Sequence, residues 1–193
     1  MTLQNALKRT LKKCCNLPQS NRQEKASVTA IQNNSSVDQQ HELCVVKATE
    51  QDIAAIQKLL THYASLGDLL PRTRSDITKN LQHFRLIKHN EEVLACGSLE
   101  NFTDELAEIR SLMVAKTMKG KGLGGILVED LIQLAETRNV KRLMALTYVP
   151  GFFHKMGFKT VDKNIFPEKV WGICVNCYKF ENCDEIAVLK ELT

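Results

Sequence analysis

Four glycines fall within six residues of this chain, in the segment Gly120-Lys121-Gly122-Leu123-Gly124-Gly125. A stretch that predicts a β-strand, residues 106–114, precedes the segment, and leucines at helical spacing follow it. Glycines at such a junction let the backbone turn tightly and approach a ligand closely. The free N–H groups at the helix start lie at the positive end of the helix dipole. The segment therefore predicts a site for an anion such as a pyrophosphate, and a purely structural turn is the alternative.

Two familiar phosphate-binding motifs do not fit this segment. A P-loop requires Gly-Lys followed by Ser or Thr after four spacer residues, and Gly120-Lys121 is followed by Gly122. A dinucleotide fingerprint belongs to a βαβ unit with an acidic residue about 20 positions further on. Here the segment follows three consecutive predicted strands, which argues against that unit.

The hydrophobic periodicity predicts a mixed α/β domain. Period-2 or continuous apolar stretches predict strands at 43–48, 84–88, 93–100, 106–114, 143–147, 158–161 and 185–189. Helices are expected from Thr49 to about Gly67, over 75–83, from Leu123 through Leu134, and over 151–156. Thr49 and Asp52 are spaced as a capping box.

Composition fits one globular domain and excludes several classes. The 193 residues are 44% hydrophobic and 25% charged, and no apolar run approaches the roughly 20 residues of a membrane span. A net charge of +4 lacks the dense basic stripe of a nucleic-acid-binding protein. Seven cysteines, an odd number, do not form a secreted disulfide pattern, which favours the reducing cytoplasm.

Residues 1–42 differ from the remainder and are expected to form a flexible basic and polar extension. Their basic residues alternate with Leu3, Leu7 and Leu11 at helical spacing. A solvated tail and an organelle-targeting or membrane-surface helix both remain open. The folded domain is expected to cover residues 43–193.

The segments Ala107–Val114 and Lys119–Gly124 together resemble motif A of the GNAT superfamily of N-acetyltransferases, which has the pattern Gln/Arg-x-x-Gly-x-Gly/Ala. Lys119 replaces the first residue of that pattern and keeps its charge. Phe152-Phe153-His154-Lys155-Met156-Gly157-Phe158 is similar to a later segment of the family. The resemblance implies a GNAT fold of the α+β kind. Its central sheet is mixed and mostly antiparallel, helices flank it, and splayed strands form the acetyl-CoA cleft.

A narrower resemblance is to short, stand-alone N-acetylglutamate synthases, the amino-acid N-acetyltransferase type. It rests on 69–73, 107–112, 145–150 and 169–172. It implies acetyl transfer from acetyl-CoA to the α-amino group of a small amino acid, L-glutamate foremost, in arginine biosynthesis. Glutamine stays open because Val149 stands near a position where longer synthases carry an arginine. Acetylation of protein lysines or N-termini also stays open, as does a non-catalytic module that senses acetyl-CoA.

The resemblance also assigns roles to individual residues. The backbone of Leu112, Met113 and Val114 would pair with the pantetheine arm. The pyrophosphate would be held by the glycine segment: Lys119, Gly120, Lys121, Gly122, Leu123, Gly124 and Gly125. Glu108 is the candidate general base, or alternatively a strand residue in an ion pair. Tyr148 is the candidate acid for the leaving thiolate, or a core-edge aromatic, because Phe153 occupies the more usual position.

Two arginines are candidates for the substrate carboxylates, since a guanidinium can bind a carboxylate through two hydrogen bonds. Arg72 follows Pro71 in an expected loop, and Arg110 lies on the same strand face as Glu108, with which an ion pair is the alternative. Cys174, Cys177 and Cys183, with His154, raise the possibility of zinc, but reduced thiols without metal are expected. The expected partners are the two substrates, with neither nucleic acid nor a membrane span, and a homodimer remains open.

Overall fold

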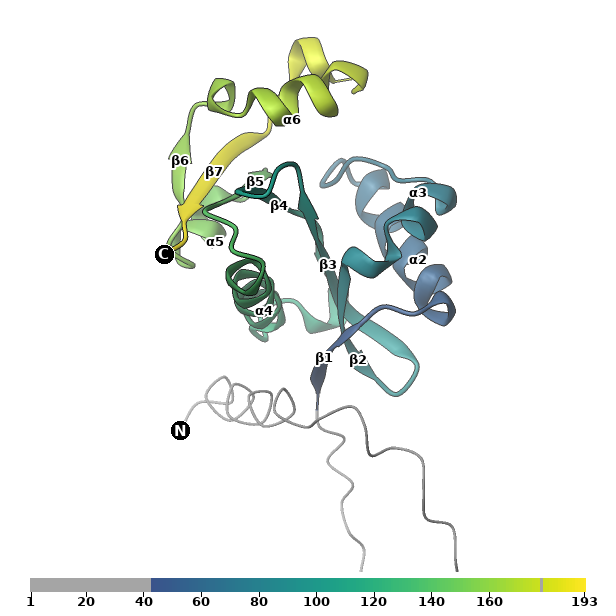
Figure 1. The fold of residues 1–193 in the computed structure, drawn as a ribbon. Coiled ribbons are helices and arrows are strands. Elements are labelled where there is room, and N and C mark those ends of the chain that lie inside the picture. Colours follow the sequence, from purple (N-terminus) through teal and green to yellow (C-terminus); the bar gives the residue numbers. More distant parts are fainter. Residues whose placement is uncertain (1–42, 178) are drawn as a thin grey trace, which may run out of the picture.

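A seven-stranded mixed sheet runs through the molecule in the order β1-β2-β3-β4-β5-β7-β6 (Figure 1). The computed structural model describes residues 43–177 and 179–193, so the expectations for residues 1–42 lie outside it. The strands are β1 Cys44–Lys47, β2 Phe84–His89, β3 Glu92–Asn101, β4 Leu106–Val114, β5 Arg142–Thr147, β6 Lys159–Val161 and β7 Ile186–Glu191. Only β4 and β5 are parallel, and every other neighbouring pair is antiparallel. The predicted mixed, mostly antiparallel sheet is confirmed.

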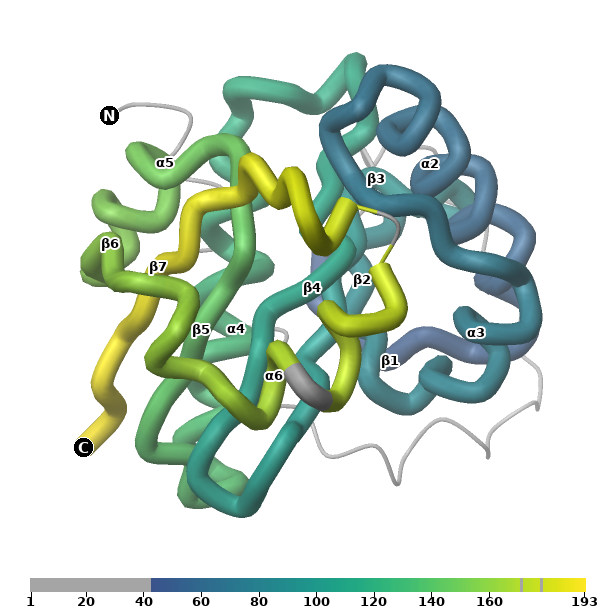
Figure 2. The backbone as a smooth tube through the Cα atoms, turned by 90° about the horizontal axis from the view of Figure 1, so that it is seen from above, coloured from purple at the N-terminus to yellow at the C-terminus, as the bar shows by residue number. Residues whose placement is uncertain are grey.

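Helices cover both faces of the sheet. Figures 1 and 2 show α2 and α3 over one face and α4 over the other. The helices are α2 Ile53–Ser65, α3 Arg74–Lys79, α4 Leu123–Thr137, α5 Pro150–His154 and α6 Pro167–Gly172. Single 3₁₀ turns are η2 Glu50–Asp52, η3 Leu81–His83, η4 Lys116–Met118, η5 Lys163–Ile165, η6 Cys174–Asn176 and η7 Phe180–Asn182.

The helix expected over 75–83 is divided into α3 and η3. Asn80 follows α3, and its side-chain amide donates 2.9 Å hydrogen bonds to the backbone carbonyl and to the carboxylate of Asp76. These bonds satisfy helix-end acceptors and end the helix. The short helix α6 has no counterpart among the expected helices.

The start and the end of α2 follow local sequence signals. The backbone N–H of Thr49 donates to the Asp52 carboxylate at 2.9 Å, which completes the capping box around η2. Asp52 is buried and forms a 2.6 Å ion pair with Lys88 of β2, so the cap also ties the helix to the sheet. At the other end, Gly67 has φ +77°, and its N–H bonds the carbonyl of Ala64. A left-handed residue at this place closes a helix.

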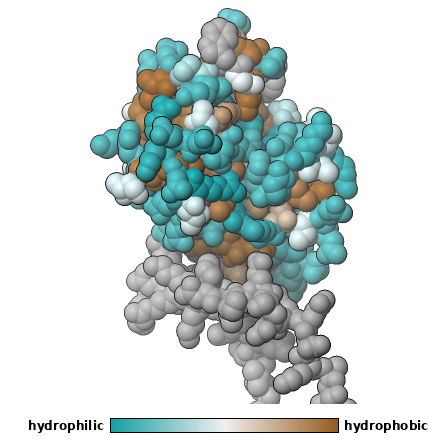
Figure 3. All heavy atoms as spheres, viewed as in Figure 1, coloured by the Kyte–Doolittle hydropathy of each residue, from teal (hydrophilic) through white to brown (hydrophobic). Residues whose placement is uncertain are grey.

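The two sheet faces carry separate hydrophobic cores. The larger core packs α4 and α5 on the sheet and includes Leu123, Leu127 and Leu131, all essentially inaccessible. The second core packs α2 and α3 on the opposite face, around residues such as Ile56 and Phe84. On the face drawn in Figure 3, hydrophilic residues predominate and hydrophobic residues occupy separate patches.

Strand β4 separates from β5 after Glu108 and then carries a bulge against β3. Ser98 of β3 faces Arg110 and Cys96 faces Met113, so Ser111 and Leu112 together lie opposite Gly97. Ser111 has φ +51°, an unusual conformation for a residue with a side chain. Pairing of β4 with β5 covers Leu106 to Glu108 and ends there, although β4 continues to Val114. The backbone beyond Glu108 therefore borders an opening in the sheet.

The bulge shifts the alternation of side chains along β4. Before it, Ala107 and Ile109 belong to the core under α4, and Glu108 and Arg110 occupy the opposite face. After it, Leu112 and Val114 pack against that same core, whereas Met113 belongs to the core under α2. Because of the one extra residue, Glu108 and Arg110 lie on one face of the sheet, whereas Leu112 and Val114 lie on the other face, against the core under α4.

Candidate active site

A cavity of about 920 Å³ occupies the opening between β4 and β5. Its walls come from α2, the loop 68–72, β4, the glycine segment, the end of β5, α5, α6 and the residue before β7. The predicted site residues that line it are Arg72, Glu108, Arg110, Leu112, Met113, Val114, Lys119, Gly120, Gly122, Leu123, Gly124, Gly125 and Tyr148. Lys121 lies outside the lining, exposed, with its Nζ 3.5 Å from the sulfur of Met118. The fold therefore gathers residues from both halves of the domain.

The glycine segment forms a backbone cradle at the start of α4. Gly120 and Gly122 have φ of +77° and +86°, a conformation that other residues rarely adopt. Gly122 is the N-cap of α4, so backbone N–H groups rather than a capping side chain border the cavity there. A Cβ added at Gly124 would contact Phe152 at 3.5 Å and Val114 at 3.6 Å, which shows how closely the loop packs. Free N–H groups at a helix start bind phosphate well.

Tyr63 of α2 supports this cradle, and sequence reasoning missed it. Its hydroxyl donates a 2.5 Å hydrogen bond to the carbonyl of Val114, and the Nζ of Lys119 lies 4.8 Å from the centre of its ring. The side chain is buried and lines the cavity. In the sequence, Tyr63 continues the apolar face of α2, so its pattern indicates a core residue. Its contacts connect α2 to the end of β4 and to the lysine just before the cradle.

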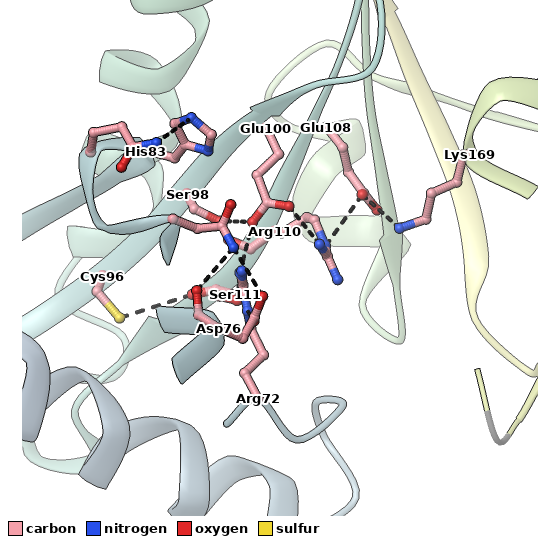
Figure 4. A network of polar contacts seen from close by, with 12 residues as sticks. Arg72, Asp76, His83, Cys96, Ser98, Glu100, Glu108, Arg110, Ser111 and Lys169 are labelled. Atoms are coloured by element: carbon pink, nitrogen blue, oxygen red, sulfur yellow. Dashed lines mark hydrogen bonds and ion pairs between the residues drawn. The ribbon is translucent and has the colours of Figure 1, made fainter. Parts of the chain in front are cut away.

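Five charged side chains of alternating sign form a chain, and four of them line the cavity (Figure 4). Nη1 of Arg72 lies 2.7 Å from Oε1 of Glu100, whose Oε2 lies 2.5 Å from Nη1 of Arg110. Oε2 of Glu108 then lies 3.4 Å from Nε of Arg110 and 2.7 Å from Nζ of Lys169. The first arginine comes from the loop before α3, the middle three residues from β3 and β4, and the lysine from α6. The network therefore joins parts of the chain that are almost 100 residues apart in the sequence.

Ion pairing fixes the charges at the centre of this network. Burial alone would raise the pKa of Glu100, but Arg110 and Arg72 outweigh it and hold that pKa below its usual value. Burial would lower the pKa of Arg110, and Glu108 and Glu100 outweigh it in the other direction. These groups are therefore ionised at neutral pH, and each holds its neighbour in position.

One donor of Arg72 is left without a partner. Its Nε donates to the carboxylate of Asp76, and its Nη1 also reaches the Ser111 hydroxyl at 3.2 Å. The guanidinium lies 5.3 Å from the ring centre of Phe84. Its Nη2 is buried and has no hydrogen-bond partner among the described residues. A buried, unsatisfied donor beside a cavity is suited to a ligand oxygen.

Tyr148, at the end of β5, faces the cavity with its hydroxyl already hydrogen-bonded. It donates to the Asp184 carboxylate at 3.0 Å and accepts from Nζ of Lys179 at 3.0 Å. Burial raises the pKa of Tyr148 and outweighs the effect of Lys179, so the phenol is protonated at neutral pH. Phe153 is buried in edge contacts with Phe152 and Phe158.

Two further charged residues at the site were not predicted from the sequence, Lys169 and Glu185. Both line the cavity, Lys169 from α6 and Glu185 from the position before β7. Burial, and next the charge of Glu108, raise the pKa of Glu185. The chain between β6 and β7, where both residues lie, has no regular hydrophobic periodicity. Only the folded structure therefore shows that the two residues belong to the site.

The C-terminal cysteines Cys174, Cys177 and Cys183 are free, partly exposed thiols, and Cys177 lines the cavity. Burial raises the pKa of Cys174. His154 bonds Thr160 at 2.9 Å. Within residues 43–177 and 179–193, no group of three or more His, Cys, Asp or Glu side chains has a metal-binding arrangement. In the same part of the chain, no helix has both the length and the apolar character of a membrane span.

Comparisons with known proteins agree with this geometry. Residues 41–158 match the family model described as "Acetyltransferase (GNAT) family". An uncharacterized N-acetyltransferase of Chlorobaculum tepidum is 37% identical over 149 residues, which cover 77% of this chain and 96% of the relative. An amino-acid acetyltransferase of Mycobacterium tuberculosis is 31% identical over 121 residues, which cover 61% of this chain and 69% of the relative.

A solved structure has the same fold. N-acetylglutamate synthase from Neisseria gonorrhoeae, complexed with coenzyme A and N-acetyl-glutamate, superposes with a TM-score of 0.72 at 24% identity. The match covers 78% of this chain but 35% of that enzyme, so this chain corresponds to about a third of its length.

Proposed function

The chain belongs to the GNAT family of acetyltransferases, and on this basis we propose that it transfers the acetyl group of acetyl-CoA to the α-amino group of a small amino acid, L-glutamate foremost. The relatives named amino-acid acetyltransferase support an amino acid as acceptor. The Neisseria gonorrhoeae enzyme shares the fold and is named for the same product. We propose further that residues 43–193 are the catalytic domain and that the protein acts in the cytoplasm, in arginine biosynthesis.

The donor side of the cavity fits the pyrophosphate and pantetheine of acetyl-CoA. Gly120 to Gly125 present backbone N–H groups at the start of α4, and Lys119 adds a positive charge beside them. Along β4, the backbone from Ile109 to Val114 has no pairing with β5, so Leu112 to Val114 offer hydrogen-bonding groups to an extended ligand. The carbonyl of Val114 already accepts from Tyr63.

One observation on the acceptor side of the cavity supports an amino acid as the substrate. Nη2 of Arg72 is buried beside the cavity without a hydrogen-bond partner among the described residues. A substrate carboxylate would satisfy this donor with a charge-assisted hydrogen bond. Arg110, whose Nη1 and Nε face Glu100 and Glu108, adds a second positive charge to the same cavity lining. The side chain of a peptide lysine carries no carboxylate that could bind the guanidinium groups of Arg72 and Arg110.

The reaction needs an amine that has lost a proton and a protonated leaving group. We propose that Glu108 places a negative charge beside the substrate ammonium, and that Tyr148 donates a proton to the CoA thiolate. Burial of Glu108 supports the first role, and the place of the protonated Tyr148 phenol in the cavity lining supports the second.

Thiol release from acetyl-CoA, measured with a panel of acceptors, tests this function. The panel contains glutamate, glutamine, aspartate, lysine and a lysine-containing peptide, and mass spectrometry identifies each product. We expect N-acetylglutamate or a close relative to form with the highest kcat/KM. Acetylation of the peptide alone would contradict the proposal, and binding of acetyl-CoA without any turnover would indicate a sensor.

A further inference from the structure

Three carboxylates line the cavity, those of Asp68, Glu108 and Glu185. Acylation of an amino acid at neutral pH requires one group that takes a proton from the substrate ammonium. Asp68 is exposed in the loop after α2. The two glutamates lie deeper, and their surroundings differ in a way that separates their roles.

Glu108 is held in place by two cations. Its Oε2 lies 2.7 Å from Nζ of Lys169 and 3.4 Å from Nε of Arg110, and both Glu108 and Lys169 are buried. Loss of either partner from a buried ion pair is costly, so the contacts of Glu108 with these cations are a fixed part of the site. A carboxylate without such partners is freer to exchange a proton with the substrate.

Glu185 lines the same cavity from a different element. Ile186 pairs with Thr147 across the antiparallel β5–β7 ladder, so Glu185 lies beside the end of β5 that carries Tyr148. No hydrogen bond or close ion pair involves its side chain in the described part of the chain, residues 43–177 and 179–193. It is partly buried and borders the cavity.

The charged groups that act on Glu185 come from three elements. Glu108 and Arg110 act from β4, Lys169 from α6, and Lys179 from the segment between η6 and η7. Two of the three cations, Lys169 and Arg110, already pair with Glu108. The third, Lys179, bonds the Tyr148 hydroxyl at 3.0 Å and lies 3.4 Å from the Asp184 carboxylate. Glu185 is thus a second carboxylate beside the first, without a cation of its own.

We propose that Glu185 accepts the proton of the amino-acid ammonium, while Glu108 holds that ammonium by its fixed charge. This inference rests on the proposed function. The ammonium loses one proton to Glu185, and the nitrogen lone pair then forms the N–C bond with the acetyl carbonyl. The C–S bond breaks as the amide forms, and the second proton lost by nitrogen ends on the CoA sulfur, with Tyr148 placed to relay it. Glu185 afterwards releases its proton to solvent.

The electrostatics agree with this division of roles. Burial, followed by the charge of Glu108, raises the pKa of Glu185 and brings proton uptake closer to neutral pH. Two carboxylates in contrasting environments commonly divide in this way between a fixed charge and a proton carrier.

The experiment compares Glu185→Gln, Glu108→Gln and the exposed control Glu181→Gln by their pH–rate profiles for the best amino acid. For Glu185→Gln we expect kcat to fall about 100-fold or more and the acidic limb of the profile to disappear. The affinity for acetyl-CoA, measured from the rise in melting temperature that the ligand causes, should not change. Glu108→Gln should raise KM for the amino acid and keep the acidic limb of the pH–rate profile. Glu181→Gln should have the same kcat, KM and pH–rate profile as the parent protein. Formate should restore part of the activity of Glu185→Ala, which a purely structural role would not allow.

A retained acidic limb in Glu185→Gln would overturn the inference, and its loss in Glu108→Gln instead would identify Glu108 as the base. Parent protein that releases no thiol with any amino acid would reject the proposed function itself, and this inference with it.

Discussion

Nζ of Lys169 lies 2.7 Å from Oε2 of Glu108, and both side chains are buried, although 61 residues separate them in the sequence. The contact joins α6 to the first half of β4 at the cavity. A buried pair of this kind positions its members firmly, and either partner left alone is costly. The C-terminal segment therefore helps to order the site as well as to close it.

Removal of the lysine charge should show this dependence. We expect Lys169→Met to lower the free energy of unfolding by about 3–5 kcal/mol, because it leaves a buried carboxylate without its closest cation. The double variant Lys169→Met with Glu108→Gln should recover part of that loss. Urea unfolding measures both, with the exposed Lys141→Met as a control that should change the value by less than about 0.5 kcal/mol. Equal losses in the lysine variant and the control would show that the pair contributes little.

The glycine segment contains two lysines that should differ in their effect on acetyl-CoA. Lys119 lines the cavity and lies over the Tyr63 ring, whereas Lys121 lies outside the lining. Lys119→Ala should weaken CoA binding by about 2- to 5-fold, since an exposed charge contributes modestly. Lys121→Ala should leave the affinity nearly unchanged. Calorimetric titration at low salt decides this, and a larger effect at Lys121 would place the phosphates elsewhere.

Arg72 should control the affinity for the amino acid. Loss of a charge-assisted hydrogen bond costs about 1.5–3 kcal/mol, so Arg72→Ala should lower kcat/KM about 10- to 100-fold through KM for the amino acid. The KM for acetyl-CoA should stay nearly constant. Arg72→Lys should recover only part, because a lysine cannot reproduce the fork of donors. The exposed Arg74→Ala is the matched control, and equal changes in both KM values of Arg72→Ala would indicate a structural arginine.

Glu100 should make stability sensitive to acid. Arg110 and Arg72 outweigh its burial and keep its pKa low in the folded protein, so the folded state binds fewer protons than the unfolded chain. Its contribution to stability is therefore complete above the unfolded-state pKa of about 4.3 and is lost as the pH falls through the lower folded-state value. In Glu100→Gln, the free energy of unfolding should vary less with pH below about 5. Parallel curves for the two proteins in urea unfolding would refute this.

Much of the fold follows from local signals in the sequence. The largely apolar stretch 106–114 predicted β4 with its observed bounds, and Thr49, Asp52 and Gly67 marked the limits of the region that holds η2 and α2. These signals are readable because each depends on residues a few positions apart. The glycines before α4 are a signal of the same kind.

The remainder of the site depends on contacts between distant residues. Lys169 belongs to the short helix α6 and Glu185 directly precedes β7. Their importance comes from Glu108, which lies far away in the sequence. Tyr63 looked like another apolar residue of α2, because only the folded chain places the Val114 carbonyl at its hydroxyl. Local patterns contain no information about such pairings.

The bulge at Ser111 makes the length of β4 as important as its composition. Substitution of a side chain on this strand affects one position, whereas loss of a single residue at Ser111 or Leu112 would restore uninterrupted alternation along the strand. If the strand instead lost the bulge and kept all its residues, either Glu108 and Arg110 would turn into the apolar layer beneath α4, or Leu112 and Val114 would leave it. A strand of this length therefore needs the bulge to keep its charged pair and its later apolar residues on opposite faces of the sheet.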